Sequence, residues 1–508
     1  MRGCNHFRLR LNWVYRSACG SQKVIKGKLF LVLLFCATAS AKGRFRSGDW
    51  VTYGNFRYVS SVSVGFTHVY FGTTEGILRF DRNRRAFDAP MTAADGLPDA
   101  PVRQLAYDPL TDQLYASTAL GAAYFLPAFG EWYPASFPDS LGKRDRSKLP
   151  LLVPDDFKLR YLGDGQVGDN YFRRFRFTDW ADDGFNNLWV GSWGLGAFVG
   201  DLRLGTLSRL PYGLLTSRVA ALWIEPEKIW FACLRKGADA GGLVLWDLKE
   251  EHWSWWEAGL ATNFPPDDIF AVAGNQNFIF LGTEEGIIRY DRKTGYFRST
   301  GRRGGLRGET VLALLATEGG LFAGTRYGVY AVDPKTDSVW NLTSPSIAGA
   351  VTNDLKMAGG YLWAATNRGL FRRAAGSKNW TRFSDSSQIA SSTIRSLAVS
   401  GEFLWAGGLR GLLQINTVSD STAGYRIAAG EADLDVYALG ANGKYVWAAV
   451  RSGVYQFDPE NKEWDFLSEL EGLASNEIYQ ISVDGDYVWL ATASGASRFF
   501  WDAPHLRK

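Results

Sequence analysis

The sequence contains only four cysteines, four histidines and three methionines in 508 residues. Cys4, Cys19 and Cys36 lie within the first 41 residues, so Cys233 is alone in the remainder and cannot form an intrachain disulfide there. The histidines are isolated, and no His/Cys cluster has the spacing of a zinc site. No Gly-x-Ser-x-Gly elbow, phosphate loop or dinucleotide fingerprint occurs in context. These absences exclude most active-site types, although a hydrolase that uses only carboxylates stays open.

Acidic residues are absent from residues 1–41, which carry seven basic ones. The apolar run Leu29–Ala37 and the small residues Ala39–Ala41 follow, in the pattern of a secretory signal peptide. The run is too short to span a bilayer, and the alternatives are a membrane anchor or a core strand. A phenylalanine precedes Cys36, where a lipoprotein signal has a small residue, so lipid anchoring at Cys36 is disfavoured. We therefore expect residues 1–41 to be a leader and residues 42–508 to be exported, to the periplasm or beyond.

The charge balance changes sign once the leader is set aside. The whole chain has 56 basic and 52 acidic residues, a formal charge of +4, and removing seven basic residues leaves 49 against 52, or −3. The net charge of the chain without the leader therefore gives no reason to expect a nucleic-acid partner. The apolar content of 46% and aromatic content of 15% exclude a disordered or fibrous protein.

One pattern recurs along the chain: two apolar residues, two small ones, a short turn, a glycine and an alternating strand. VYFGTTEGILRFD at Val69 and IFLGTEEGIIRYD at Ile279 are examples. The turn glycines of the ten copies are Gly76, Gly121, Gly196, Gly242, Gly286, Gly328, Gly369, Gly411, Gly453 and Gly495. Successive glycines are 45, 75, 46, 44, 42, 41, 42, 42 and 42 residues apart, so one gap is long and the others are nearly constant.

Each repeat predicts four short strands, and a four-stranded antiparallel unit of about 42 residues is typical of a propeller blade. The last repeat, from Val488, lacks a fourth strand, whereas Asp49–Asn55 carries a fourth-strand tryptophan without the strands before it. The N-terminal segment should therefore complete the last blade and remove two sheet edges. We predict an all-β propeller of about ten blades in one closed ring, with two smaller propellers as the alternative.

Three stretches match a longer pattern. Ala94–Asp108 (ADGLPDAPVRQLAYD) has its lead-in, Gly282–Asp291 (GTEEGIIRYD) its core, and Glu471–Gly495 both. Through them, and over nearly all of Trp50–Trp501, the chain resembles the ligand-binding propeller repeats of bacterial two-component regulators. This resemblance implies a propeller outside the inner membrane that senses or binds glycans, and it is far more specific for fold than for function. The rings of that family usually have seven blades, which does not fit ten repeats.

Four successive repeats carry an arginine in the turn between the second and third strands. In a propeller these turns and the links between blades lie on one face, around the mouth of the channel. The predicted ligand-binding residues there are Arg326, Tyr327, Arg368, Arg410 and Arg451, with Arg303 and Arg307 in the link before the first of them. An arc of guanidinium groups suits carboxylate or sulfate ligands. The alternative is a solvated ring of loops whose charge is balanced by glutamates on other blades.

The long gap predicts an insertion at about residues 134–172, between the second and third blades, on the same face. It mixes basic and acidic residues and ends with Tyr171 and Phe172, while Trp193 in the following turn is placed to stack on a sugar ring. Long loops on rigid scaffolds often carry function. The alternative is a lid or a brace between blades.

Together these patterns favour an extracytoplasmic protein that recognises an acidic glycan or an envelope protein. We expect a monomer without cofactor, metal, nucleic-acid partner or membrane span in the mature chain. Two alternatives stay open: a polysaccharide lyase or glycoside hydrolase on the same scaffold, and a structural component of an envelope or secretion assembly.

Overall fold

Antiparallel β-strands make up most of the chain, and in the described residues the one helix is a short 3₁₀ turn, η1 (Ala93–Asp95). The computed structural model describes residues 45–46, 48–138, 149–150, 152–301, 305–306, 308–429, 432–433 and 435–506. The expected leader and Cys36 lie outside these residues. The described part includes no helix with the length and apolarity needed to cross a bilayer.

The predicted four-stranded repeat is present throughout the described chain, as nine sheets of four strands, one sheet of seven and a separate hairpin. The turn between the second and third strands shows why the repeat carries its Thr and Gly. Thr73 Oγ1 donates to the Gly76 carbonyl at 2.9 Å and accepts from the Glu75 amide at 3.1 Å. Gly76 has φ +132°, and a Cβ there would lie 2.4 Å from the Met91 carbonyl oxygen. Only glycine fits this close approach.

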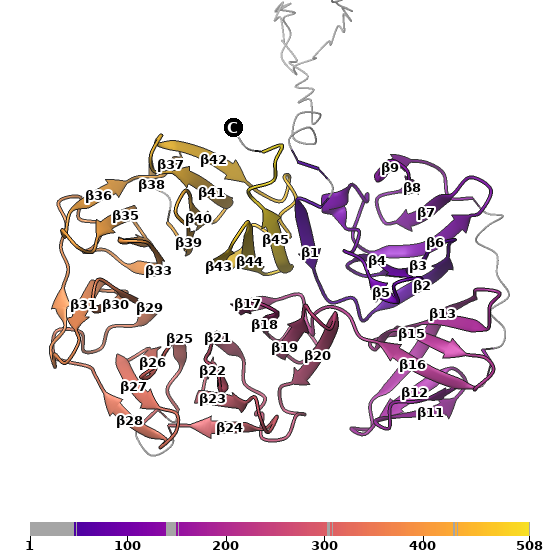
Figure 1. Cartoon of the computed structure of the whole chain (residues 1–508), viewed down its shortest axis with the longest axis horizontal. Helices are drawn as coiled ribbons and strands as arrows, with labels where there is room; N and C mark the ends of the chain where they lie inside the picture. Colours follow the sequence, from indigo (N-terminus) through magenta and orange to yellow (C-terminus); the bar gives the residue numbers. More distant parts are fainter. Residues whose placement is uncertain are drawn as a thin grey trace, which may run out of the picture. The chain divides into compact units, whose positions relative to one another are not determined.

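Seven sheets, from β17 onward, follow one another around a ring (Figure 1). Their strands are β17 (Val219–Glu225), β18 (Lys228–Cys233), β19 (Gly242–Asp247) and β20 (His252–Glu257); β21 (Ile269–Gly274), β22 (Phe278–Thr283), β23 (Gly286–Asp291) and β24 (Phe297–Thr300); β25 (Val311–Thr317), β26 (Gly320–Thr325), β27 (Val329–Asp333) and β28 (Ser338–Asn341); β29 (Thr352–Ala358), β30 (Tyr361–Thr366), β31 (Gly369–Ala374) and β32 (Thr381–Arg382); β33 (Ile394–Ser400), β34 (Phe403–Gly408), β35 (Gly411–Asn416) and β36 (Thr422–Tyr425); β39 (Ala438–Ala441), β40 (Val446–Val450), β41 (Gly453–Asp458) and β42 (Glu463–Leu467); β43 (Ile478–Asp484), β44 (Tyr487–Thr492), β45 (Gly495–Phe500) and β1 (Trp50–Tyr53).

The inner strands of these seven sheets pack in a cycle, because β43 contacts β17 as well as β39. At the point where the cycle returns, the Gln480 side chain accepts from the Leu222 amide at 2.8 Å and donates to the Leu222 carbonyl at 3.1 Å. Elsewhere in the cycle, Asp354 accepts from the Leu397 amide at 2.8 Å. Each such bond ties a side chain of one inner strand to the backbone of the next.

Strand β1 completes the last sheet of this ring. It pairs antiparallel with β45, with Trp50 opposite Phe499 and Tyr53 opposite Ala496. The Trp50 ring stacks on Phe499 at a centroid distance of 4.4 Å. The predicted pairing of the N-terminal segment with the last repeat is therefore present in the structure.

The remaining three sheets form a separate group, which we call the arc. Its strands are β2 (Val59–Val64), β3 (His68–Thr73), β4 (Gly76–Asp81) and β5 (Ala86–Phe87); β6 (Val102–Asp108), β7 (Gln113–Thr118), β8 (Ala122–Leu126) and β9 (Glu131–Pro134); and β10 (Val153–Pro154), β11 (Leu159–Gly163), β12 (Gln166–Asp169), β13 (Arg174–Asp182), β14 (Asn187–Trp193), β15 (Gly196–Asp201) and β16 (Thr206–Leu210). The separate hairpin is β37 (Ala428–Ala429) with β38 (Ala432–Asp433).

In the arc, β2 lies between β13 and β6. Asp179 of β13 accepts from the Val62 amide at 2.7 Å, and Ser61 of β2 accepts from the Leu105 amide at 3.1 Å. These contacts differ from the single ring of ten that the repeat spacing predicted. The alternative of two smaller propellers is nearer to them, but among the described strands β6 does not pack substantially against β13, so the three sheets of the arc do not repeat the cycle of the seven.

The described end of the predicted insertion is strand rather than loop. Strands β11 and β12 extend the third sheet beyond β13, and β10 pairs in parallel with β16 at its other edge. Leu152, Leu159 and Val167 are buried against Phe198 of β15. This segment therefore extends the third sheet at both edges and adds buried apolar residues to its core.

A shared hydrophobic core holds the arc against the ring. It includes Phe71 and Trp189 from the arc, Trp253 and Trp489 from the ring, and Tyr212 from the segment that joins them. The Tyr212 ring lies 4.8 Å from Phe87 and 5.3 Å from Trp253. Aromatic contacts of this kind add to the free energy gained by burying the rings.

Candidate functional site

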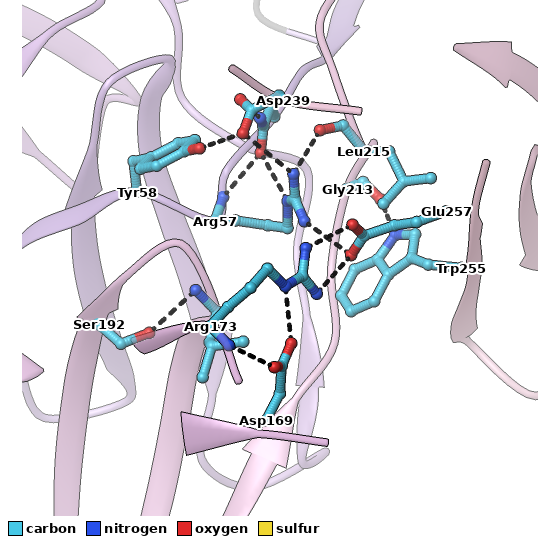
Figure 2. Close-up of polar contacts among 12 residues, drawn as sticks. Arg57, Tyr58, Asp169, Arg173, Ser192, Gly213, Leu215, Asp239, Trp255 and Glu257 are labelled. Carbon is cyan, nitrogen blue, oxygen red and sulfur yellow. Dashed lines mark hydrogen bonds and ion pairs between the residues drawn. The ribbon is translucent and has the colours of Figure 1, made fainter. Parts of the chain in front are cut away.

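A cavity of about 230 Å³ lies where the arc meets the ring, and we call it the junction cavity. Its polar groups come from segments far apart in the sequence (Figure 2). Arg57 and Tyr58 precede β2, Arg173 precedes β13, Asp239 lies between β18 and β19, and Glu257 ends β20. Strand ends and turns thus bring charged groups of both signs to one place.

Arg57 lies at the centre of these contacts and is almost completely buried. Its guanidinium donates to the Leu215 carbonyl at 2.7 Å and to Asn55 Oδ1 at 3.2 Å. It also pairs with Asp239 and with Glu257, at 3.7 Å in each case. A buried guanidinium needs such partners, because an unpaired charge away from water is costly.

Arg173 joins the described end of the insertion to the first sheet of the ring. It donates to Asp169 at 2.7 Å and to both carboxylate oxygens of Glu257, at 2.6 and 3.3 Å. Burial lowers the pKa of Arg173, but the hydrogen bonds to Glu257 and Asp169 outweigh burial and raise it. Tyr171 donates to the Leu260 carbonyl at 2.8 Å, so this segment does contact the ring, as a brace would.

Tyr58 lines the cavity, and Trp193 packs against Tyr58 without lining the cavity itself. Trp193, which the sequence singled out, ends β14 beside the cavity with 47% of its surface exposed. Its ring meets the Tyr58 ring edge-on at 5.2 Å. The Tyr58 hydroxyl donates to Asp239, and burial, followed by that hydrogen bond, raises the pKa of Tyr58 to about 12.

The chemistry of the junction cavity is that of a paired network. Arg57 and Arg173 each contact Glu257, and Arg57 also contacts Asp239. A glycosidase needs one carboxyl group that protonates the leaving group as a general acid. Here both carboxylates, Asp239 and Glu257, are paired with arginine or hydrogen-bonded to tyrosine. This arrangement suits holding the arc in a fixed position better than it suits acid–base catalysis.

One group in the described chain could hold a metal ion. The ligand atoms of His68, Asp81 and Asp88 lie within 4.8 Å of one another. However, Arg84 already pairs with both carboxylates, and His68 Nε2 lies 2.8 Å from Asp88. We assign no metal to this group, because a cation there would have to displace a guanidinium.

The four predicted arginines of the turns lie on consecutive sheets of the ring. The turns that carry them are β26–β27, β30–β31, β34–β35 and β40–β41, and we call the set the arginine row: Arg326, Arg368, Arg410 and Arg451. All four are exposed, as is Tyr327. Their sheets are neighbours, because β25, β29, β33 and β39 pack in that order. The antiparallel order of each sheet places all four turns at the same end of the strands.

The arginine row has few internal partners. Arg368 donates to the Ala348 carbonyl at 2.9 Å, and Arg410 lies 3.4 Å from Gln388 Oε1. None of the four pairs with a carboxylate among the described residues. Arg303 and Arg307, also predicted to bind ligand, lie outside the described residues.

Acidic groups gather on the same face, at the sheet before the row. Asp267 and Asp268 precede β21, and Glu284 and Glu285 form the β22–β23 turn. Burial, and then the charges of Glu285 and Glu284, raise the pKa of Asp267. These four carboxylates therefore lie on the sheet next to the one that carries Arg326.

Sequence reasoning found the arginine row and Trp193 but missed the junction cavity. Arg57 and Glu257 are 200 residues apart, and nothing local marks either residue. One signal was present: the copy of the repeat at Ile229 has a longer turn than the others, and Asp239 lies in that turn. The structure does not bring the arginine row and Trp193 into one site.

No family model matches the chain, and no curated protein matches it either. Among solved structures it is similar to PorZ of Porphyromonas gingivalis, described as a bacterial surface component of the type-IX secretion system. The identity is 15%, the TM-score 0.58, and the match covers 89% of this chain and 87% of that one. This likeness supports the propeller fold.

Extracellular domains of two-component systems from B. thetaiotaomicron are also similar. BT4673 matches at 15% identity and a TM-score of 0.46, over 87% of this chain and 70% of that one. BT3049 matches at 12% identity and a TM-score of 0.31, over 88% of this chain and 82% of that one. The family that the sequence resembles is thus represented among the similar structures, as expected.

Proposed function

We propose that the chain is an extracytoplasmic propeller that recognises an acidic glycan through the arginine row. The observation that carries this proposal is the placement of four exposed arginines in equivalent turns of consecutive sheets. A repeated fold presents them at similar intervals, and a polymer with repeated carboxylate or sulfate groups offers matching partners. Arginine suits such groups because its planar donors bind two oxygens at once.

The contacts of the row support this proposal. Ion pairs within a chain satisfy many of its other arginines, as Asp420 does for Arg372 through two hydrogen bonds of 2.6 and 2.9 Å. The guanidinium groups of the row have no such carboxylate partner among the described residues, so a ligand would not first have to break an ion pair. The expected leader at residues 1–41 supports a location where envelope glycans are available.

The test compares two variants of the mature chain that each lose four positive charges. One replaces the arginine row with alanine. The control replaces four exposed lysines in turns at the opposite end of the strands: Lys249, Lys293, Lys335 and Lys444. Binding to a panel of sulfated and uronate polysaccharides, with a neutral glucan as reference, is measured by calorimetry.

We expect the arginine-row variant to bind the acidic polymers at least about tenfold more weakly, since each charged hydrogen bond contributes about 1.5–3 kcal/mol. The lysine variant should lose much less. Equal losses in the two variants would mean that only net charge matters, and unchanged binding in both would contradict the proposal. Release of reducing ends from the same panel would favour the lyase or hydrolase alternative.

A second candidate function is a structural part of an envelope assembly. It is favoured by the likeness to PorZ, which extends over most of both chains. In this case, a protein partner should co-purify with the wild-type chain from an envelope extract of its own host. The same partner should co-purify with the arginine-row variant, because that contact would not depend on acidic glycans.

A further inference from the structure

A second cavity lies in the arc, between the sheet β2–β5 and the sheet containing β13–β16, and we call it the inter-sheet groove. Its volume is about 520 Å³, within the range of about 300–1,000 Å³ that is usual for small-ligand sites. Three turns reach its lining: β2–β3, β4–β5 and β13–β14. These turns lie at one end of the strands, and the turns between second and third strands, which carry the arginine row in the ring, lie at the other end. The groove is therefore distinct from the proposed glycan face.

Aromatic side chains supply both the interior and the mouth of the groove. Phe80 and Trp189 are buried and their rings lie 5.2 Å apart. Phe66 and Phe185, on the turns, are 64% and 73% exposed. Phe66 meets Tyr107 edge-on at 5.6 Å, and the Arg82 guanidinium lies 5.8 Å from the Phe185 ring, yet most of both residues stays exposed at one cavity. Adjacent exposed apolar groups of this kind mark binding sites more often than isolated apolar residues do.

Arg82 and Asp183 connect the turns on the two sides of the groove. Arg82 donates to Asp183 at 3.0 Å and to the Gly65 carbonyl at 3.2 Å. Asp183 also accepts from the Phe185 amide at 2.8 Å and from Asn187 Nδ2 at 2.9 Å. This pair is satisfied within the protein, so it fixes the positions of the turns and contributes no net charge to the groove.

Arg85 gives the groove its net positive charge. Its backbone is left-handed, with φ +56°, at the end of the β4–β5 turn. It is exposed, it lines the groove, and its side chain has no hydrogen bond or ion pair with any described residue. The neighbouring Arg84 differs, because it pairs with Asp81 and Asp88 and does not line the groove.

We propose that the inter-sheet groove binds an aromatic carboxylate, with the aromatic ring between Phe66 and Phe185 and the carboxylate on Arg85. One unpaired guanidinium complements one negative charge, and its two parallel donors match a carboxylate. The aromatic mouth selects a flat apolar group next to that charge. A free aromatic acid and the C-terminal aromatic residue of a peptide share this chemistry.

The experiment measures binding of N-acetyl-phenylalanine to the mature chain by calorimetry and by the fluorescence of the tryptophans. The amide of the same compound lacks the charge, and N-acetyl-alanine lacks the ring. We expect the free acid to bind and both reference compounds to bind at least about tenfold more weakly. A Gly/Ser hexapeptide that ends in phenylalanine separates the two sources: tighter binding than the free acid indicates a peptide terminus, and weaker binding indicates a small aromatic acid.

Two matched variants assign the charge to Arg85. Arg85→Gly removes the side chain and introduces glycine, which tolerates the left-handed backbone at this position. Arg84→Ala removes a cation from the adjacent position. Binding should weaken about tenfold in the first variant and little in the second. No binding of the acid at millimolar concentration, equal binding of acid and amide, or equal losses in both variants would overturn the proposal. Thermal unfolding of each variant confirms that the fold is retained.

Discussion

Replacing Trp50 should test whether strand β1 holds the seven-sheet ring closed. Trp50 is only 4% exposed and stacks on Phe499. Its ring also packs so closely against Gly472 that a Cβ at that position would lie 2.8 Å from the indole. Its indole nitrogen has no hydrogen-bond partner in the part of the chain that the structure describes. The contribution of this side chain is therefore apolar burial and stacking rather than hydrogen bonding.

The size of the effect follows from this burial. An aromatic side chain that buries about 200 Å² at about 25 cal/mol per Å² contributes about 5 kcal/mol, and measured tryptophan or phenylalanine truncations cost about 3–5 kcal/mol. We expect Trp50→Ala to lower the free energy of unfolding by about 3–5 kcal/mol, and Trp50→Phe to cost less because no hydrogen bond is lost. Urea unfolding followed by tryptophan fluorescence measures both.

Trp340 offers a matched control, because it occupies the fourth-strand position of another sheet but is 53% exposed. Trp340→Ala should cost about half as much as Trp50→Ala or less, since about half as much surface leaves water on folding. If the two alanine variants had the same free energy of unfolding, the buried tryptophan of the closing strand would stabilise the protein no more than a half-exposed one. That result would refute the reasoning.

Two further predictions concern buried titratable groups. Burial raises the pKa of Glu75, against the opposing effect of Lys236, so its stabilising contribution is present below its unfolded pKa and is lost as the pH rises through the folded pKa. Glu75→Gln should therefore gain stability relative to the wild type between mildly acidic and neutral pH, and a pH-independent difference in urea unfolding would contradict this. Burial also raises the pKa of the Cys233 thiol to about 11. A thiol reagent at pH 8 should leave the folded mature chain unmodified and react only after guanidinium is added, and rapid reaction of the folded chain would refute this.

The repeat pattern predicted the sheets well because each sheet depends on short-range signals. The Thr and Gly of the second turn, seen at Thr73 and Gly76, recur because their hydrogen bond and backbone shape are needed wherever the second and third strands meet. The incomplete last repeat predicted the pairing of β1 with β45, since an unpaired edge is unfavourable.

Membership of a ring could not be predicted in this way. Whether β43 packs against β17 or against β2 depends on the contacts between the inner strands. The hydrogen bond from the Leu222 amide to the Gln480 side chain is one contact that is specific to the β43–β17 pair. The spacing across that boundary, 46 residues from Gly196 to Gly242, hardly differs from most of the other spacings and so does not mark it. The long gap was expected to be a loop, yet Leu159 and Val167 belong to strands that extend the third sheet at its edge and are buried in its core.

The pairing of β1 with β45 also sets an order of events during synthesis. Trp50 is made long before Phe499, so the first strand of the ring has no partner while the sheets between them form. Contacts between such distant segments are slow to form, and the unpaired strand is prone to aggregate in the meantime. Only a chain translated through β45 can close the ring, so a prematurely terminated product would keep an open edge that quality-control proteases could recognise.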